Sequence, residues 1–227
     1  MLEVDNIYAE RGGKSLLSGV SLKVGRGEMV ALLGASGSGR TALLNAIGGL
    51  VPVAGGAMRL NGHDLEPTTA GRIRQGIGFV RAAGTEFRGL SVEEHLLVAA
   101  RPGPFTPLQI YTVFPSLRPH RHRPPAALAR AERRMLAIGQ ALVGNARLLL
   151  IDAATEGLER DPRHQILDVL RRLRDRGYGI LLVDTCLEEL RFLADRFLVL
   201  ADGRIVTEVD RVHNLLTPAS LARTLGV

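Results

Sequence analysis

Short apolar segments separated by turn residues run along the whole chain. Residues 29–33, 147–152 and 180–183 are almost entirely aliphatic, which is typical of parallel strands buried on both faces. Residues 2–4 and 20–24 instead alternate between apolar and polar side chains, as strands do when one face meets solvent. Strands of both kinds, separated by helical stretches, predict an α/β fold with a mostly parallel sheet.

Helix and turn signals divide these segments. Ser91 and Glu94 match a capping box, which predicts a helix over residues 93–100. The dipeptide Asp161-Pro162 predicts the start of another helix, which Gly177 would end.

Three dipeptides mark turns. Asn61-Gly62 and Asp202-Gly203 predict hairpin turns between short strands. Gly55-Gly56 predicts a break in the chain after the helical stretch that precedes it.

Residues 101–127 differ from the rest of the chain. They are rich in proline and carry a basic cluster, and only residues 110–114 form a short apolar piece. Residues 132–143 then return to helical spacing. We therefore expect one domain in which a loop-rich helical lobe, about residues 83–144, is inserted between core segments of about 1–82 and 145–227.

A glycine-rich segment follows the aliphatic residues 29–33 and leads into a helical stretch. Its members are Gly34, Ala35, Ser36, Gly37, Ser38, Gly39, Arg40 and Thr41. The spacing matches the phosphate-binding loop Gly-x-x-x-x-Gly-Lys-Ser/Thr at every fixed position except the lysine, which is Arg40 here. Such glycines let backbone N–H groups turn toward a phosphate, and the helix start adds partial positive charge. The segment predicts a nucleotide site, and an ordinary strand-to-helix turn is the alternative.

A second candidate site residue is Asp152, which ends an aliphatic strand about 110 residues after the loop. A carboxylate at the end of such a strand, together with the hydroxyl of Thr41, would hold Mg²⁺ beside the phosphates of ATP. The alternative is an exposed acid without a ligand.

Composition and charge exclude several classes of protein. No run approaches the about 18 apolar residues that a membrane helix needs, and we expect no signal peptide at the N-terminus. The single cysteine, Cys186, cannot form an internal disulfide, which suits a reducing cytosol. The formal charge is +6, but the basic residues at 118–134 lack interleaved aromatics, so we expect a solvated or lipid-facing surface and no nucleic-acid partner.

The order of motifs resembles the ATP-binding subunits of ABC transporters, most closely those of branched-chain amino-acid importers. The segments that carry this resemblance, besides the loop, are residues 19–22, 90–94, 113–117, 135–139, 148–152, 156–158, 202–206 and 225–227. The resemblance implies a RecA-like P-loop core, an antiparallel β lobe, a helical lobe, and ATP and Mg²⁺ as ligands. It also implies a homo- or heterodimer of such subunits, docked on membrane permease subunits at the inner, cytoplasmic face of the cell membrane.

Several positions that carry the chemistry of this family are substituted. The phosphate-binding lysine, the adenine-stacking aromatic residue, the glutamine that senses Mg²⁺, the catalytic glutamate and the switch histidine are replaced, in this order, by Arg40, Arg11, Ala82, Ala153 and Thr185. Tyr8 lies near Arg11 in the sequence and is the nearest aromatic residue. Only the two ends of the signature Leu-Ser-Gly-Gly-Glu survive in residues 128–132, where Arg130 replaces the first glycine.

Two functions follow from this mixture of kept and lost motifs. Ala153 cannot accept a proton, and a general base typically contributes about 10²–10⁴-fold. We therefore expect a nucleotide-binding subunit of an importer whose own ATP hydrolysis is weak or absent. The alternative is a fully competent ATPase motor, in which Glu156 would be the first candidate for the missing base. A different P-loop NTPase acting on nucleic acid would make the other family matches coincidental.

Overall fold

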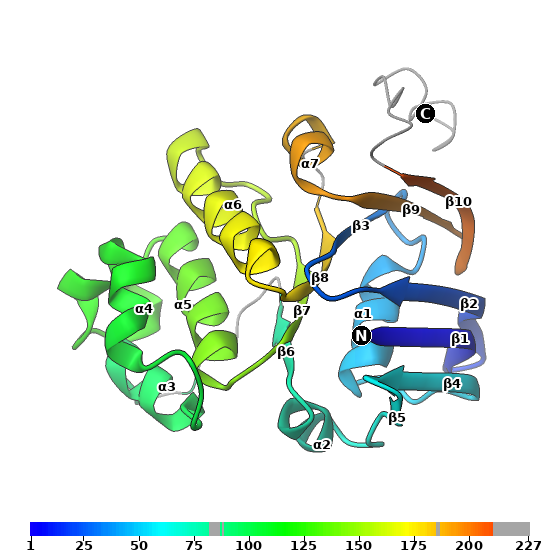
Figure 1. Cartoon of the computed structure of the whole chain (residues 1–227), viewed down its shortest axis with the longest axis horizontal. Helices are drawn as coiled ribbons and strands as arrows, with labels where there is room; N and C mark the ends of the chain where they lie inside the picture. The colour runs from blue at the N-terminus through cyan, green and yellow to red at the C-terminus, as the bar shows by residue number, and fades with distance from the viewer. Residues whose placement is uncertain (82–86, 88, 185–186, 211–227) are drawn as a thin grey trace.

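The structure, a computed structural model, describes residues 1–81, 87, 89–184 and 187–210 (Figure 1). In chain order the elements are β1 (Leu2–Arg11), β2 (Lys14–Val24), β3 (Met29–Leu33), α1 (Arg40–Gly48), β4 (Gly55–Leu60), β5 (His63–Asp64), α2 (Thr69–Arg74), β6 (Ile77–Val80), α3 (Val92–Ala99), α4 (Pro107–Val113), η1 (Pro115–His120), η2 (Pro125–Ala127), α5 (Arg130–Val143), β7 (Leu148–Asp152), α6 (Arg160–Asp175), β8 (Gly179–Val183), α7 (Leu187–Leu193), β9 (Arg196–Ala201) and β10 (Arg204–Asp210).

A six-stranded sheet forms the centre, in the order β10-β9-β3-β8-β7-β6. All of its neighbouring pairs are parallel except β9 and β10, so the predicted mostly parallel sheet is confirmed. Every residue of β3, β7 and β8 is buried, as the uniformly aliphatic pattern predicts. Alternate residues of β3 lie on opposite faces of the sheet. Met29, Ala31 and Leu33 pack into one apolar core, whereas Val30 and Leu32 pack into the other, which contains α1 and the second sheet.

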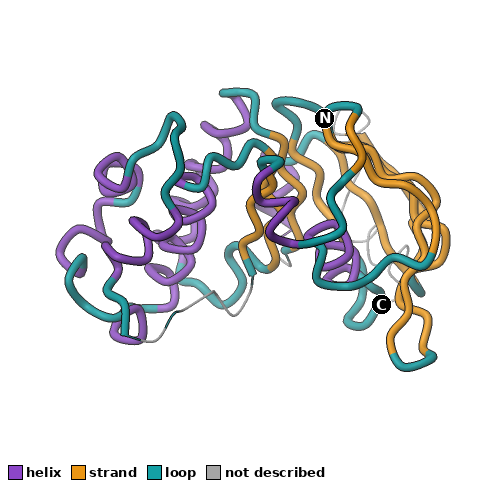
Figure 2. The backbone as a smooth tube through the Cα atoms, turned by 90° about the horizontal axis from the view of Figure 1, so that it is seen from below, coloured by secondary structure: helices purple, strands orange, loops and turns teal. Residues whose placement is uncertain are grey.

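The second sheet has four antiparallel strands in the order β2-β1-β4-β5. Its apolar face shares one core with α1 and with the near face of the central sheet. Figure 2 shows the strands gathered toward one end of the molecule and most helices toward the other. This arrangement places the segment between β3 and α1 beside both sheets.

The segment between β6 and β7 is mainly helical, and it holds α3, α4, α5 and two short 3-10 helices. The predicted capping box is present, because Ser91 accepts a hydrogen bond from the N–H of Glu94 and the Glu94 carboxylate accepts one from the N–H of Ser91. A second capping box, between Thr106 and Gln109, opens α4 within the proline-rich stretch. That helix is longer than the predicted apolar piece, because Pro107 at its first turn favours helix rather than loop.

Two local predictions were wrong. Gly55-Gly56 does not break the chain but opens β4, where a Cβ at Gly56 would collide with the backbone of Asn6 on β1. The helix predicted to start with Asp161 as N-cap and Pro162 as its first residue starts two residues earlier, with Glu159 as its N-cap, so Asp161 and Pro162 lie inside its first turn. Both hairpin turns and the end of that helix near Gly177 agree with the structure.

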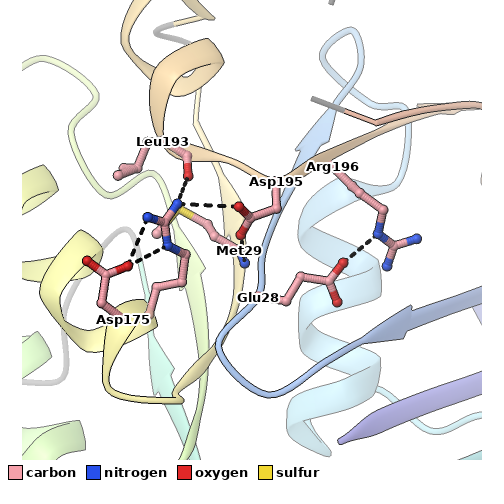
Figure 3. Close-up of polar contacts among 7 residues, drawn as sticks. Glu28, Met29, Asp175, Leu193, Asp195 and Arg196 are labelled. Atoms are coloured by element: carbon pink, nitrogen blue, oxygen red, sulfur yellow. Dashed lines mark hydrogen bonds and ion pairs between the residues drawn. The ribbon is translucent and has the colours of Figure 1, made fainter. Parts of the chain in front are cut away.

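A polar cluster joins the start of the central strand to distant elements (Figure 3). The Asp195 carboxylate accepts a hydrogen bond from the N–H of Met29 at 2.9 Å, and it forms an ion pair with the Arg174 guanidinium at 3.4 Å. Arg174 also donates to the carbonyl of Leu193 at 2.7 Å. These bonds tie the ends of α6 and α7 to the first residue of β3, which leads directly into the glycine-rich loop. None of the helices within the described ranges is both long and apolar enough to cross a membrane.

Candidate functional site

The glycine-rich loop at residues 34–41 joins β3 to α1, as predicted. Gly34, Gly37 and Gly39 all have positive φ, of 152°, 83° and 106°. A Cβ at Gly34 would collide with the carbonyl oxygen of Leu200, and one at Gly39 would lie 2.9 Å from the carbonyl oxygen of Leu16. The loop therefore packs against backbone of β9 and β2, and only glycine permits the approach at these two positions.

The outer side of the loop is open. A Cβ at Gly37 would meet nothing within 4 Å, and Gly37 and Thr41 are exposed, whereas Arg40 is half-buried. Helix α1 starts at Arg40, and its cap residue Gly39 offers no side chain to the first N–H groups. These donors have no partner within a helix, and the buried hydroxyl of Ser38 has no hydrogen-bond partner among the residues that the structure describes. Open space beside unpartnered donors and the positive end of a helix suits a phosphate group.

Asp152 lies at the carboxyl end of β7, and the loop follows the carboxyl end of β3. Only β8 separates these two parallel strands, so both groups lie at the same edge of the sheet. The Asp152 side chain is buried to all but 9% of its surface. The predicted place of this carboxylate at a strand end is confirmed, and its role as a Mg²⁺ ligand stays a prediction.

Ala153 follows Asp152 and is itself buried, with a φ of 55°. Its N–H donates to the carbonyl of Val183 at 2.8 Å, which holds the end of β7 against β8. The methyl group at this position supplies no proton acceptor, as the sequence predicts.

Asp184 was not among the predicted site residues. It is 2% exposed, and its carboxylate accepts hydrogen bonds from the N–H of Thr155 at 2.6 Å and from the hydroxyl of Thr155 at 2.9 Å. The segment after β7 is thereby held against the end of β8. An acid directly after the aliphatic β8 was the only sequence signal for it.

Arg134 was also missed by sequence reasoning. It lies on α5 and is only 7% exposed. Its Nη1 donates to the carbonyl of Arg81, just after β6, at 2.7 Å and to the carbonyl of Asp152 at 3.2 Å. Burial lowers the pKa of Arg134, and the charges of Asp152 and Asp184 act in the opposite direction. The Arg134 cation therefore lies beside Asp152, the predicted Mg²⁺ ligand. In the sequence, Arg134 stands in a polar helical stretch, which had suggested only a solvated residue.

The substituted signature forms the start of α5. Ala129 is the N-cap and has no oxygen to bond the first turn, although its N–H donates to the Glu132 carboxylate at 2.8 Å. Arg130 is exposed at the first helical position. Its guanidinium lies against Gly157, in the segment after β7, so the signature contacts that segment of its own chain.

Other predicted positions are placed as follows. Arg11 is exposed at the end of β1, and Tyr8 is 43% exposed and lies over Gly19 and Gly55. Neither is brought against the loop by any contact of the structure. Ala82, Thr185, Cys186 and residues 225–227 lie outside the described residues.

Within the described ranges, no group of three or more His, Cys, Asp or Glu side chains is arranged to hold a metal ion. Mg²⁺ is commonly bound through one or two carboxylates together with substrate phosphates. Thr41 and Asp152 thus suit this ion only in company with a bound nucleotide.

An apolar groove of about 290 Å³ lies where α2, β6, α3 and α5 meet. It is lined by α2, β6, α3 and α5, and exposed side chains of Phe87 and Val98 border it. The N–H of Phe87 donates to the buried ring of His95 at 2.8 Å, which holds that residue at the groove.

Comparison with known proteins places these features in context. A profile of the ABC transporter family matches residues 17–156. The chain is 34% identical to the high-affinity branched-chain amino acid transport ATP-binding protein BraG of Pseudomonas aeruginosa, an alignment that covers 100% of both chains. It is 32% identical to the methionine import ATP-binding protein MetN of Caulobacter vibrioides, over 96% of this chain and 68% of that protein.

Solved structures show the same fold. The ATP-binding subunit of an ABC transporter superposes with a TM-score of 0.85 at 25% identity and covers 100% of both chains. A dimeric bacterial ABC transporter cassette superposes with a TM-score of 0.80 at 24% identity, over 93% of this chain and 99% of that one. The predicted P-loop core with an antiparallel lobe and helical elements is therefore confirmed.

Proposed function

This chain belongs to the ABC transporter family, and from that premise we propose that it is the ATP-binding subunit of an importer, with weak or absent hydrolysis of its own. The BraG relative, aligned over its whole length, supports a solute of the branched-chain amino-acid class. As in the prediction from sequence, the partners are a second ATP-binding subunit and membrane permease subunits at the inner face of the membrane.

The observation that carries nucleotide binding is the loop at residues 34–41. Its glycines bring backbone against β2 and β9 on one side and leave unpartnered N–H groups on the open side. Arg40 adds a positive charge at the position of the usual lysine, but a planar guanidinium is not equivalent to a compact ammonium at a tight phosphate site. Binding should therefore be weaker than a lysine would give. Mg²⁺ bound with the phosphates would neutralise their charge, held by Thr41 and Asp152.

Weak hydrolysis is inferred from Ala153 and from the signature. The buried methyl of Ala153 leaves no base at the end of β7. Arg130 occupies a position where the family carries a glycine, so the site that this chain completes on a partner subunit is altered as well.

Calorimetric titration with ATP tests the binding. Binding should be measurable at millimolar nucleotide, and Gly39→Val should abolish it, because a side chain there collides with the Leu16 carbonyl. Gly62→Val is the matched control: Gly62 also has a positive φ, of 84°, but lies in the β4–β5 turn, at the opposite edge of the second sheet from β2, with nothing within 4 Å of an added Cβ. Absence of heat and of a thermal shift with the unaltered chain would overturn the proposal.

The competent ATPase remains the second candidate, and Glu156 is the observation that favours it. Glu156 is an exposed acid four residues after Asp152. It directly follows Thr155, whose N–H donates a hydrogen bond to the Asp184 carboxylate, and it precedes Gly157. Steady phosphate release by the unaltered chain, lost in Glu156→Gln but kept in Glu159→Gln, would establish that candidate and overturn weak hydrolysis.

The apolar groove supports docking on a permease. Exposed apolar surface next to a hollow marks interaction sites, and a short amphipathic helix of a permease subunit suits a groove between helices. Val98 is 68% exposed at this groove, whereas Val206 is 53% exposed on the edge strand β10. Val98→Glu should abolish copurification with permease-containing membranes, and Val206→Glu should leave it unchanged. If both variants copurify with these membranes equally well, the groove is not the docking site.

A further inference from the structure

His95 is a fully buried histidine of α3, with an exposed fraction of 0%. Both of its ring nitrogens have partners. Nδ1 lies 2.8 Å from the carbonyl oxygen of Ser91, one turn earlier in the chain, and Nε2 accepts a hydrogen bond of 2.8 Å from the N–H of Phe87. Because a carbonyl oxygen can only accept, Nδ1 carries the proton and Nε2 carries the lone pair. These two bonds therefore require the neutral form of His95.

Phe87 depends on His95 for its place beside the apolar groove. Its ring lies against the imidazole, with 5.7 Å between the ring centroids and 34° between the ring planes. Phe87 is 50% exposed and lines the groove. An apolar residue that is half exposed gains little from burial, so the hydrogen bond to His95 and the ring contact are what fix it there.

A second proton on His95 is incompatible with this arrangement. It would occupy the Nε2 lone pair that accepts the Phe87 N–H, and two donors would then face each other. The ring would also carry a charge in a buried place, which is unfavourable unless an acid matches it. Histidine is the side chain whose charge ordinarily changes between about pH 5 and 8. The bond to Phe87 is therefore complete while His95 is neutral and is lost as the pH falls.

The acids around His95 already have other partners. Glu94 acts on the ring through its charge, but its carboxylate is bonded to the N–H and hydroxyl of Ser91. Glu93 pairs with His122 at 3.5 Å, and Glu132 pairs with His120 at 3.3 Å. The other charged or titratable groups on the elements packed around α3 are Arg101, Tyr111, Arg118, Arg121, Arg123, Arg130, Arg133 and Arg134. Most of these are cations, which disfavour a second proton on His95 rather than stabilise it.

We propose that His95 is a positioning residue, which in its neutral form holds Phe87 at the apolar groove and releases it on taking up a proton. The groove is the surface at which a permease helix is proposed to dock, so docking of this chain is sensitive to pH. Only this last step rests on the proposed function, because the attachment of Phe87 can be measured without a permease.

Amide hydrogen exchange of the full chain, followed by NMR, tests the attachment of Phe87. Protection is expressed relative to an unstructured peptide of the same sequence, because the exchange of a free amide itself depends on pH. The Phe87 N–H should be protected at about pH 7.5, and its protection should fall at least about tenfold at about pH 5.5. The N–H of Leu149, in the buried strand β7, should keep its protection at both pH values.

The variant His95→Gln separates proton uptake from a purely structural role. A glutamine amide can accept the Phe87 N–H but does not titrate, so Phe87 should be protected equally at both pH values. His122→Gln is the matched control: it removes an exposed histidine beside the start of α3 and should keep the pH dependence of the unaltered chain. If thermal melts show that His95→Gln does not fold, the ring nitrogen shifts of His95 in the unaltered chain replace it, and they should titrate over the pH range in which Phe87 loses protection.

Equal protection of Phe87 at the two pH values in the unaltered chain would overturn the proposal, and so would the same loss of protection in His95→Gln. Copurification with permease-containing membranes then tests the docking step: it should weaken at about pH 5.5 for the unaltered chain and not for His95→Gln. Loss of Phe87 protection without any loss of copurification would overturn docking at the groove and leave the positioning role of His95 intact.

Discussion

The guanidinium of Arg130 lies directly against Gly157 within the same chain. Gly157 has a φ of 70°, and a Cβ there would collide with the Arg130 Nη1. The start of α5 is thereby joined to the segment after β7, in place of the bare backbone that the family signature would present to a partner. This contact gives a physical basis for expecting that the chain is a poor partner for another ATP-binding subunit.

Mixing with a competent subunit tests that expectation. We expect the unaltered chain to leave the ATPase rate of such a subunit unchanged, because Arg130 occupies the surface that should complete the partner's site. Replacing three residues together, as Ala129→Ser, Arg130→Gly and Ala131→Gly, should raise that rate, measured as phosphate release. Arg171→Ala should not. Strong stimulation by the unaltered chain would return it to the class of working motor subunits.

Restoring the missing glutamate alone should not restore hydrolysis. In Ala153→Glu the new carboxylate would lie beside the Arg134 guanidinium, which already contacts the adjoining carbonyl of Asp152, and would form an ion pair instead of orienting water.

Phosphate release by Ala153→Glu should therefore stay at background. The double variant Ala153→Glu/Arg134→Gln should exceed it while remaining below about 1 s⁻¹, within the low range of enzyme turnover, because the signature is still altered. A single variant that reaches about 1 s⁻¹ would show that Arg134 does not capture the carboxylate.

The loop glycines should differ sharply in their tolerance of a side chain. Gly34→Ala places a methyl group onto the Leu200 carbonyl and should lower the free energy of unfolding by about 3 kcal/mol or more. Gly37→Ala meets no neighbour and should lower it by only about 1 kcal/mol, the strain of a positive φ. Urea unfolding of the two variants measures the difference, and equal losses would contradict the packing of the loop against β9.

Arg72, a buried arginine of α2, should stabilise the C-terminal end of α1, the helix that follows the glycine-rich loop. Arg72 is 6% exposed and donates to the carbonyl oxygens of Ala46 and Ile47 at the end of α1 and, at 2.6 Å, to that of Glu66. Carbonyls at a helix end lack intrahelical partners and favour a cation.

Arg72→Ala should therefore lower the free energy of unfolding by about 2–4 kcal/mol, since it strands buried acceptors. The control Arg74→Ala, exposed on the same helix α2, should change it by less than about 0.5 kcal/mol. Denaturant melts that show no difference between the two variants would contradict this role.

Several parts of the fold were predictable because they depend on spacing within one segment. The strands β3, β7 and β8 are aliphatic throughout because both of their faces are covered, and that pattern is visible without neighbours. Helix α4 was underestimated because its prolines suggested loop, although the Thr106 and Gln109 capping pair was present in the sequence.

The candidate site also has features that were predictable from the sequence and features that were not. The sequence by itself predicted the family, which the comparisons confirm. It also predicted site roles for the loop at residues 34–41, for Asp152 and for Ala153, because each of these is a residue type at a given distance along the chain. The tertiary structure alone decided that Arg134 is a buried cation at the ends of β6 and β7 and that Arg130 covers Gly157. In the sequence both are ordinary arginines of a polar helix, and the charge and contacts of such a residue depend on which distant backbone folds against it.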